Sequence, residues 1–246
     1  MSALVEMRGL TIRSAARVLV EDVSFDIDAG KVTALVGPSG AGKSLTARAT
    51  MCVLDVAPGL TAGSLRYPAH DPAIDWFSGV RGGGARAQAA LLERSRVLRG
   101  SYLTYSPQAA SSALNPGRTI GHQLALAIGR RAAPPADVGL EISKILADVG
   151  LAPRAAASLP GELSGGMCQR AALAVAVAPK PRLVIADEPE TGLDPVLRRA
   201  VVELLVEVCQ VHGAGLLLIS HHEDTVKRLA HAVIRLPGRG SDEGGR

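Results

Sequence analysis

The chain has 246 residues, of which 47% are hydrophobic, 20% are charged and only 2% are aromatic, and its formal net charge is +4. This length and hydrophobic content suffice to bury a sizeable core, so the composition excludes a disordered chain. So few aromatic residues argue against base-stacking platforms for single-stranded nucleic acid. The mild positive charge is compatible with nucleotide, nucleic-acid or membrane partners and does not choose among them.

The cysteines and the apolar runs bear on the compartment. Cys52, Cys168 and Cys209 are odd in number and lack metal-ligand spacing, so we expect reduced thiols in a cytosolic setting. The N-terminal residues do not have the pattern of a signal peptide, and no apolar run reaches the roughly 18 residues of a membrane span. We therefore expect no membrane-spanning segment within this sequence.

The first half of the chain predicts strands, then a helix, then an irregular region. Alternating and apolar runs of strand length indicate β-strands over residues 4–13 and 18–36. The next segment, 44–57, has the composition of a helix. Residues 62–100 are rich in Gly and Pro, so we expect a loop followed by a short Arg-rich helix over 85–99.

The second half alternates strands with helices. A strand is predicted over 101–106, and helices over 119–131 and 136–149 on either side of a Pro-Pro pair. The short apolar runs 182–189 and 215–220 are typical of buried parallel strands. This alternation predicts an α/β fold.

A glycine-rich stretch, "GPSGAGKS", lies between a predicted strand and a predicted helix, from Gly37 to Ser44. It fits the G-x-x-x-x-G-K-[ST] pattern, in which backbone N–H groups converge on a phosphate at the helix N-terminus. Lys43 would meet the β- and γ-phosphates, and the Ser44 hydroxyl would bind Mg²⁺. The alternative is an ordinary Gly-rich turn, which the strand–helix context disfavours.

A pair of carboxylates, Asp187 and Glu188, ends the apolar run "RLVIADEP". A carboxylate at this end of a buried strand can hold the Mg²⁺ of a bound nucleotide through water. We therefore assign Asp187 to the metal, and Glu188 to orienting or deprotonating an attacking water. By themselves the two residues would be read as solvated acids, but the glycine-rich loop upstream disfavours that interpretation.

A second phosphate-binding device is indicated by "LSGGMCQRAALAVAVA". Ser164 stands at an N-cap position, and Gly165 and Gly166 leave the start of the following helix bare. The glycine-rich loop and the Ser164 turn could bind one nucleotide together in the same molecule. Alternatively, the glycine-rich loop of one molecule and the Ser164 turn of another could grip it together, and the sequence leaves both arrangements open.

Six motifs in order resemble those of ABC ATPases over essentially the whole chain. "LSGGMCQR" resembles the family's signature motif, "GPSGAGKS" its Walker A motif and "LVIADE" its Walker B motif. Gln108 in "YSPQ" is similar to the Q-loop glutamine, "GLDP" to the D-loop, and "LLLISH" to the strand that leads to the switch histidine, His221. In that family two subunits pair head to tail, and each signature turn grips the other subunit's nucleotide.

The resemblance implies one ABC nucleotide-binding domain over residues 1–246. Its expected fold is α/β, with a RecA-like P-loop NTPase core, an N-terminal antiparallel β subdomain and an inserted α-helical subdomain at approximately 109–168. The implied cofactors are ATP and Mg²⁺. The implied catalytic residues are Glu188, His221 and Gln108, and the implied metal-binding residues are Ser44, Gln108 and Asp187. The implied nucleotide contacts are Gly37, Pro38, Ser39, Gly40, Ala41, Gly42, Lys43, Ser44, Leu45, Ser164, Gly165, Gly166 and Asp194.

A subfamily resemblance concerns the segment "SPQAASSALNP", which is similar to a stretch of ATPases that serve dipeptide, oligopeptide and nickel importers. The Walker A and signature stretches also resemble nickel-import and opine-metallophore members, and the short C-terminal region favours the nickel-like type. This implies an ATPase subunit that energises uptake of nickel, a metal chelate or a short peptide.

The same resemblance implies partners and a location. They are integral membrane permease subunits, a second ABC ATPase subunit that is identical or, as we favour, a paralogue, and an extracytoplasmic solute-binding protein, without nucleic acid. The expected location is peripheral, on the cytoplasmic face of the inner membrane.

Two rival functions are compatible with some of the same motifs. A soluble ABC-type ATPase acting on nucleic acid or ribosomes usually has coiled-coil insertions or tandem domains, which this chain lacks. A regulatory subunit without turnover is disfavoured because Lys43, Asp187, Glu188 and His221 are all present.

Two other features are more simply explained by structure than by function, and a third departs from the family pattern. The neighbours His221 and His222 suggest a metal site, but they lack a spacing such as H-x-x-x-H, which disfavours it. The arginines between 81 and 99 are more simply a solvated helix face. No aromatic residue stands between Thr11 and Asp22 to stack on adenine, so we expect Arg13 or Arg17 to take part of that role and base selection to be weak.

Overall fold

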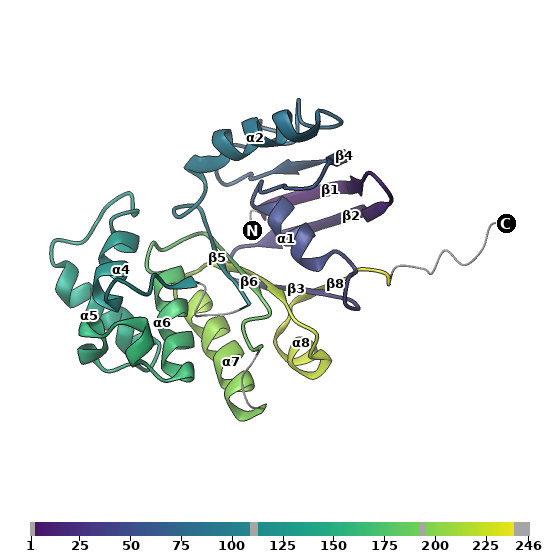
Figure 1. The fold of residues 1–246 in the computed structure, drawn as a ribbon. Coiled ribbons are helices and arrows are strands. Elements are labelled where there is room, and N and C mark those ends of the chain that lie inside the picture. The colour runs from purple at the N-terminus through teal and green to yellow at the C-terminus, as the bar shows by residue number, and fades with distance from the viewer. Residues whose placement is uncertain (1–2, 109–112, 192–194, 239–246) are drawn as a thin grey trace.

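A computed structural model of the chain describes residues 3–108, 113–191 and 195–238. It has two sheets, with helices on both sides of the larger one (Figure 1). None of the helices within the described residues combines the length and hydrophobicity that a membrane crossing requires.

The first sheet is antiparallel, with strand order β2-β1-β4. Its strands are β1 (Ala3–Ser14), β2 (Val18–Asp28) and β4 (Pro58–Arg66). Buried residues alternate along β1 at Val5 and Met7, and the alternation changes phase at a register shift so that Leu10 and Ile12 face the core. The expected N-terminal antiparallel subdomain is therefore present.

Strand β4 corrects the prediction that the chain is irregular from residue 62 onward. The cause is Gly63, which has φ +108 and packs so closely on β1 that a Cβ would lie 2.8 Å from the Cα of Leu10. The glycine that reads as a loop signal is thus required by close contact between two paired strands.

The second sheet is parallel throughout, with strand order β5-β6-β7-β3-β8. Its strands are β3 (Val32–Val36), β5 (Leu103–Ser106), β6 (Leu183–Asp187), β7 (Gly215–Ile219) and β8 (Ala232–Arg235). Every residue of β3, β6 and β7 is buried, because both faces of the sheet are covered. The carboxyl ends of these strands all lie at one edge.

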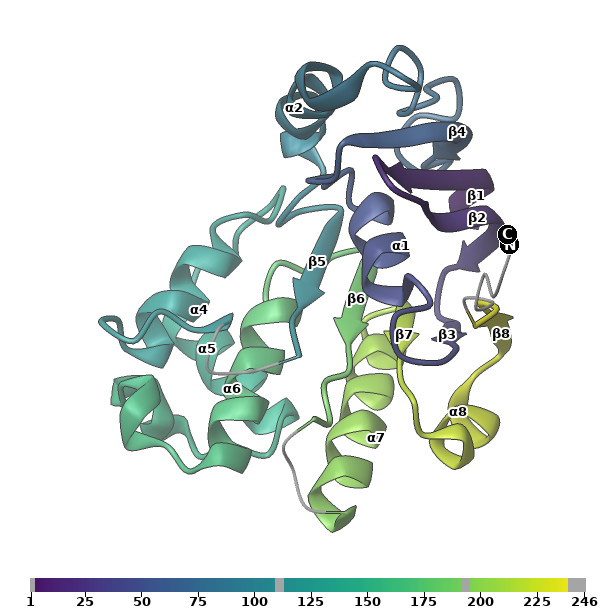
Figure 2. The ribbon, with the colours of Figure 1, turned by 45° about the vertical axis from the view of Figure 1, so that its right-hand side comes forward.

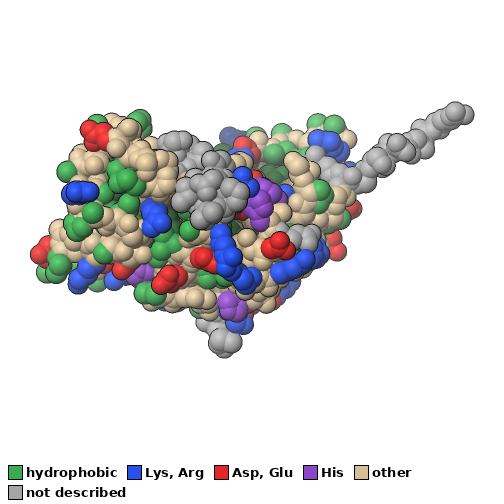
Figure 3. Space-filling model, turned by 90° about the horizontal axis from the view of Figure 1, so that it is seen from below, with side chains coloured by type: hydrophobic (Ala, Val, Ile, Leu, Met, Phe, Trp, Pro, Cys, Tyr) green, Lys and Arg blue, Asp and Glu red, His purple; other side chains and the backbone are tan. Residues whose placement is uncertain are grey.

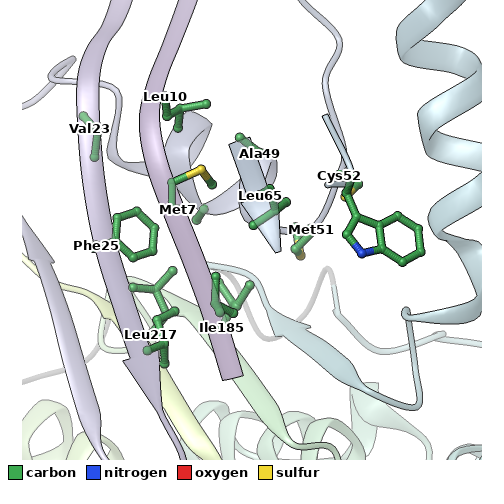
Figure 4. Close-up of a cluster of buried hydrophobic side chains, with 14 of the residues drawn as sticks. Met7, Leu10, Val23, Phe25, Ala49, Met51, Cys52, Leu65, Ile185 and Leu217 are labelled. Atoms are coloured by element: carbon green, nitrogen blue, oxygen red, sulfur yellow. The ribbon is translucent and has the colours of Figure 1, made fainter. Parts of the chain in front are cut away.

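Alternate residues of the central strands enter two different cores. On one face, Ile185 and Leu217 join Met7 and Phe25 of the antiparallel sheet, as Figure 4 shows. On the other face, β6 and β7 contribute Val184, Ala186, Leu216 and Leu218 to a core shared with the helices. The larger sheet therefore ties the two halves of the molecule together.

The helices fall into three groups in the chain. Helix α1 (Lys43–Thr50) packs against β6 and β7 of the parallel sheet, while α2 (Gly84–Arg94) lies beside β4 and is followed by the 3-10 turn η1 (Ser95–Val97). A helical cluster on one side of the molecule contains α4 (Ile120–Ile128), α5 (Val138–Asp148), η2 (Pro153–Ala157) and η3 (Pro160–Glu162) (Figures 1 and 2). The remainder are α6 (Gly165–Val177), α7 (Pro195–Val211) and α8 (Glu223–Leu229). The boundaries 109–168 of the helical subdomain stay a prediction, since α6 continues to Val177.

Helix α1 is shorter than the predicted helix over 44–57. It ends at Thr50 in a Schellman turn, where Val53 N donates to Arg48 O and Cys52 N donates to Ala49 O. Cys52 takes φ +57 to make this turn. A cysteine in the left-handed region leaves no signal in the sequence, so the end of the helix was not predictable.

Replacing Leu217 by Ala tests the importance of the central sheet. Leu217 is fully buried at the centre of β7, so the Leu217→Ala variant should lose about 2–5 kcal/mol of unfolding free energy, through lost burial and the remaining cavity. Urea unfolding followed by circular dichroism measures the change. The control Val211→Ala, at a position that is 75% exposed, should change stability by less than about 0.5 kcal/mol. Equal effects of the two variants would contradict the assignment of Leu217 to the core.

Candidate functional site

The glycine-rich loop from Gly37 to Ser44 connects β3 with α1 at the carboxyl edge of the parallel sheet. Gly42 is the N-cap of α1, has φ +92 and offers no side chain to the amides of the first turn. A Cβ at Gly42 would lie 2.7 Å from Val20 Cγ2 and 2.8 Å from Leu19 O, so only glycine fits. The bare helix start leaves its N–H groups to a ligand, as an anion site requires.

Lys43 is buried, with 8% of its surface exposed. Its ammonium donates hydrogen bonds to the carbonyl oxygens of Gly37 (2.9 Å) and Pro38 (3.1 Å), which holds the side chain folded over the loop. The chain's own structure therefore points a positive charge at the concave side of the glycine-rich loop.

Asp187, the last residue of β6, is held by two hydroxyl groups. Ser44 Oγ donates to Asp187 Oδ1 at 3.2 Å, and Tyr105 Oη donates to Asp187 Oδ2 at 3.0 Å. The Ser44–Asp187 pair joins residues 143 positions apart and brings together the two oxygen ligands that the sequence assigned to Mg²⁺. Hard oxygen donors of this kind suit that ion.

Burial raises the pKa of the Asp187 carboxyl above its ordinary value of 3.8. The hydrogen bonds from Ser44 and Tyr105 oppose this rise, the negative charge of Glu188 adds to it, and the positive charge of Lys43 opposes it. Burial also raises the pKa of Tyr105, with a further contribution from the Asp187 charge, so the tyrosine stays a hydrogen-bond donor.

Glu188 is the centre of a polar group beyond the strand end. Its Oε2 accepts from Gln108 Nε2 and from Thr191 Oγ1, both at 3.3 Å, and its Oε1 lies 3.6 Å from His221 Nδ1. Its backbone has φ +47 and donates to the Ile219 carbonyl of β7 at 3.0 Å. The three residues assigned to catalysis are thus within reach of one another in a single chain.

A cavity of about 890 Å³ contains most of these groups. The lining residues are Val36, Gly37, Pro38, Ser39, Gly40, Gly42, Lys43, Ser44, Leu45, Gln108, Glu188, Ser220, His221, Arg235 and Leu236. Asp187 and Ala41 are not among them, although Asp187 contacts Ser44 directly. The volume is ample for a nucleotide.

The Ser164 turn lies outside the wall of this cavity. Ser164 caps α6 by accepting from Met167 N, as its sequence position indicated, and Ser164 and Gly165 are exposed. Neither Ser164, Gly165 nor Gly166 lines the cavity, and a Cβ at Gly165 would meet no atom within 4 Å. No contact among the described residues therefore requires a glycine at position 165. The remaining predicted contact, Asp194, is outside the described residues.

The tip of the β1–β2 hairpin approaches the glycine-rich loop through Leu19 and Val20. Arg13 and Arg17 are exposed near this tip, and the backbone of Arg17 closes the hairpin on Ser14. The role of these arginines toward adenine stays a prediction.

Most arginines between 81 and 99 have structural contacts. Arg81 pairs with Asp75 at 2.9 Å, Arg94 donates to Trp76 O, and Arg99 donates to Ser95 Oγ. On the face of the molecule seen in Figure 3, basic side chains of the described residues alternate with acidic ones and form no continuous stripe. Neither the arginines between 81 and 99 nor the face in Figure 3 forms the continuous basic patch that is typical of a nucleic-acid-binding surface.

Sequence reasoning missed several residues at this site. Tyr105 lies in a predicted strand that carries no mark of a site, and Arg235 and Leu236 lie on β8 and just beyond it, a strand that the sequence pattern does not predict. Gln169 of α6 donates to Pro189 O and so links the helix of the Ser164 turn to the loop that follows Asp187. Only the pairing of β8 with β3 brings Arg235 to the cavity.

The pKa of Asp187 leads to a prediction about stability without nucleotide. Because the folded state disfavours the ionised carboxyl, stability falls as pH rises from the ordinary pKa of 3.8 through the raised pKa. Asp187→Asn should therefore raise the thermal unfolding midpoint at pH 7, and the gain should shrink as the pH is lowered toward 4. The exposed control Glu207→Gln should show neither effect. A lower midpoint for Asp187→Asn at pH 7 would contradict the burial argument.

Comparison with known sequences gives consistent matches. A family model described as ABC transporter matches residues 20–191. The nickel import ATP-binding protein NikD of Pseudomonas putida is 34% identical over 233 residues, covering 94% of this chain and 83% of that protein. A putative peptide import ATP-binding protein of Brucella ovis is 33% identical, covering 94% and 68%. The peptidoglycan transport ATP-binding protein YejF of Agrobacterium fabrum is 34% identical, but the chain spans only 41% of its length.

Two solved structures of ABC transporter subunits have a similar fold. Clostridium perfringens cbiO1, part of the ABC transporter complex cbiONQ, superposes with a TM-score of 0.74 at 19% identity, covering 96% of this chain and 85% of that one. An ATP binding subunit of an ABC transporter gives 0.70 at 27% identity, covering 95% and 85%. These matches lend no support to a nucleic-acid or ribosomal role. The chain belongs to the ABC transporter family, as an ABC-type ATPase subunit homologous to importer ATPases.

Proposed function

We propose that this chain binds Mg-ATP at the carboxyl edge of its parallel sheet and hydrolyses it to energise import of a small solute. The observation that carries the proposal is the convergence of Lys43, Glu188 and His221, which follow three different strands, around one cavity. Asp187, at the end of β6, joins them through its hydrogen bond from Ser44. Convergent charged groups beside a bare helix start form a phosphate site with a catalytic carboxylate.

The phosphate end of ATP would lie on the glycine-rich loop. The free amides at the start of α1 would donate to phosphate oxygens, and the Lys43 ammonium would exchange its two carbonyl contacts for the β- and γ-phosphates. Ser44, Asp187 and Gln108 would hold Mg²⁺, directly or through water. When bound, this ion neutralises negative charge on the phosphates.

Glu188 is the residue best placed to act on the attacking water. Its carboxylate points into the cavity and is already held from both sides by Gln108 and His221. It would orient the water and accept its proton as the water oxygen attacks the γ-phosphorus. His221 would donate a hydrogen bond to the γ-phosphate, and the ADP oxygen would leave on the opposite side.

The Ser164 turn would serve a second subunit. Its exposure and its absence from the cavity wall favour the arrangement in which the turn of one molecule completes the site of another. The backbone amides and the Ser164 hydroxyl would then approach the γ-phosphate held by the partner, and the missing side chain at Gly165 would leave room for it. The partner is an identical chain or, as we favour, a paralogue.

A second cavity, of about 460 Å³ between β5, α4 and α6, supports docking on a membrane permease. Its wall includes Leu126, which is 52% exposed, together with Ala127 and Val175. Basic side chains of Arg99, Arg118 and Arg130 also line it. An apolar cytoplasmic segment of a permease, flanked by acidic residues, would fit this groove. From the importer relatives we also propose a peripheral position at the cytoplasmic face of the inner membrane and a solute-binding protein outside.

The cargo is proposed from the relatives. Because the similar proteins serve import of nickel and of peptides, we propose nickel, a metal chelate or a short peptide as the solute. Nothing in the ATP site itself distinguishes these cargoes.

Glu188→Gln tests the proposed reaction. Removing the negative charge while keeping the size should lower ATP hydrolysis by on the order of 10²–10⁴-fold, because the amide that replaces the carboxylate cannot take the water's proton. ATP affinity, measured by calorimetry, should be retained. The control Glu93→Gln, whose side chain is 78% exposed, should behave as wild type. Hydrolysis by Glu188→Gln within about twofold of wild type would remove Glu188 from the assigned role.

Mixing two inactive variants tests the two-subunit site. Ser164→Arg should block closure and Lys43→Ala should abolish phosphate binding, whereas the control Ala133→Arg adds the same charge on an exposed loop and should stay active. If the chain forms homodimers, random pairing of equal amounts of the two variants makes about half of all dimers heterodimers. Each heterodimer has one intact site of its two, so roughly one quarter of wild-type ATPase activity should return.

The outcome of mixing also identifies the partner. A wild-type chain that is inactive alone, with no recovery on mixing, indicates that a paralogue is required. Full activity of Ser164→Arg without any partner would contradict a shared site.

A further inference from the structure

A second polar cluster lies beside the proposed catalytic group. Glu190, His221 and His222 each offer a ligand atom, and these atoms all lie within 4.8 Å of one another. All three residues line one cavity of about 300 Å³, together with Arg198, Arg199, Val202, Asp224 and Thr225. An ion entering from solvent could therefore reach all three.

Glu190 has an unusual environment for a carboxylate. The residue is only 1% exposed, and its Oε1 accepts a hydrogen bond from Ser220 Oγ at 2.6 Å. Its Oε2 is buried and has no hydrogen-bond partner among the described residues. An ionised carboxylate in this setting is costly unless a cation neutralises it.

The turn after β7 supplies both imidazoles. Consecutive residues of a strand point to opposite sides, but the chain bends at Ser220, where His222 N donates to Ser220 Oγ at 3.1 Å. The rings of His221 and His222 consequently lie with their centroids 4.1 Å apart, tilted by 42°. The same serine hydroxyl thus holds Glu190 and the turn that carries both histidines.

We propose that Glu190, His221 and His222 bind a divalent transition-metal ion of the Zn²⁺ class. Two imidazole nitrogens and one carboxylate oxygen are the donors that such ions prefer, and Mg²⁺ prefers an all-oxygen shell. Tetrahedral coordination would bring the ligand atoms to about 3.4 Å apart, a movement that side-chain rotation of the half-exposed His221 can supply. Water would complete the shell.

Metal binding would compete with catalysis. His221 Nδ1 lies 3.6 Å from Glu188 Oε1, and coordination would turn its ring toward Glu190 instead. The ion would therefore hold the subunit inactive, a regulatory consequence that rests on the proposed function. The binding itself does not depend on it.

Zinc affinity measured without ATP is the direct test. The untagged protein would compete with a chromogenic chelator for Zn²⁺, and for Ni²⁺ in parallel, with millimolar Mg²⁺ present throughout. We expect one Zn²⁺ per chain. The His222→Ala and Glu190→Gln variants should each weaken it by tenfold or more, since even an outer-shell change costs about 10–100-fold. Glu190→Gln preserves the size of the side chain and an acceptor for Ser220.

Two outcomes would overturn the proposal. One is that His222→Ala binds Zn²⁺ as tightly as wild type; the other is that His122→Ala, which removes an exposed histidine on α4, loses as much affinity. A second arm measures ATPase activity at buffered free Zn²⁺, as a ratio to the zinc-free rate. Wild type should be inhibited and His222→Ala should not. A chain that hydrolyses ATP but binds no Zn²⁺ would refute this inference and leave the proposed function standing.

Discussion

Parallel pairing of β3, β6 and β7 brings the ends of three strands to one edge of a sheet whose faces are both buried. The residues that follow each strand leave the core at the same place, so the glycine-rich loop, the carboxylate pair and the histidines meet there. The Ser44–Asp187 hydrogen bond across this edge depends on that pairing. A shift of one strand by one residue would turn alternate side chains to the other face and separate the groups.

Acidic residues gather at this edge. Asp187 ends β6 and Glu188 and Glu190 come directly after it, while the buried ammonium of Lys43 lies in the glycine-rich loop. Burial raises the pKa of Asp187, and Glu190 Oε2 has no hydrogen-bond partner within the described part of the chain. Cations placed beside these carboxylates would stabilise their ionised forms.

Different elements pack on the two faces of the parallel sheet. The antiparallel sheet packs on the parallel one through Met7 and Phe25, and its hairpin holds the start of α1 through Leu19 and Val20. On the opposite face, α6 links the helical cluster to the catalytic loop through Gln169 and Pro189. The Gln169–Pro189 hydrogen bond connects α6 to the loop that carries the carboxylates, and the groove between α4 and α6 borders the same helix.

Local chemistry explains what could be predicted. The alternating and apolar runs predicted the main strands, and the spacing of the glycines, Lys43 and Ser44 predicted the phosphate loop, because such patterns reflect neighbours within a few residues. The end of α1 at Cys52 and the strand around Gly63 were missed, since one depends on a left-handed cysteine and the other on close packing against Leu10.

The sequence by itself determined the fold class, the family resemblance and the residue types of the nucleotide site. Only the tertiary structure decided which of them meet: it placed Tyr105 on Asp187, Arg235 in the cavity, and the two histidines beside Glu190. It also kept Gly165 out of the cavity that contains Lys43. The physical reason is that these contacts join residues far apart in the chain, and strand order and helix packing set their distances whereas local spacing does not.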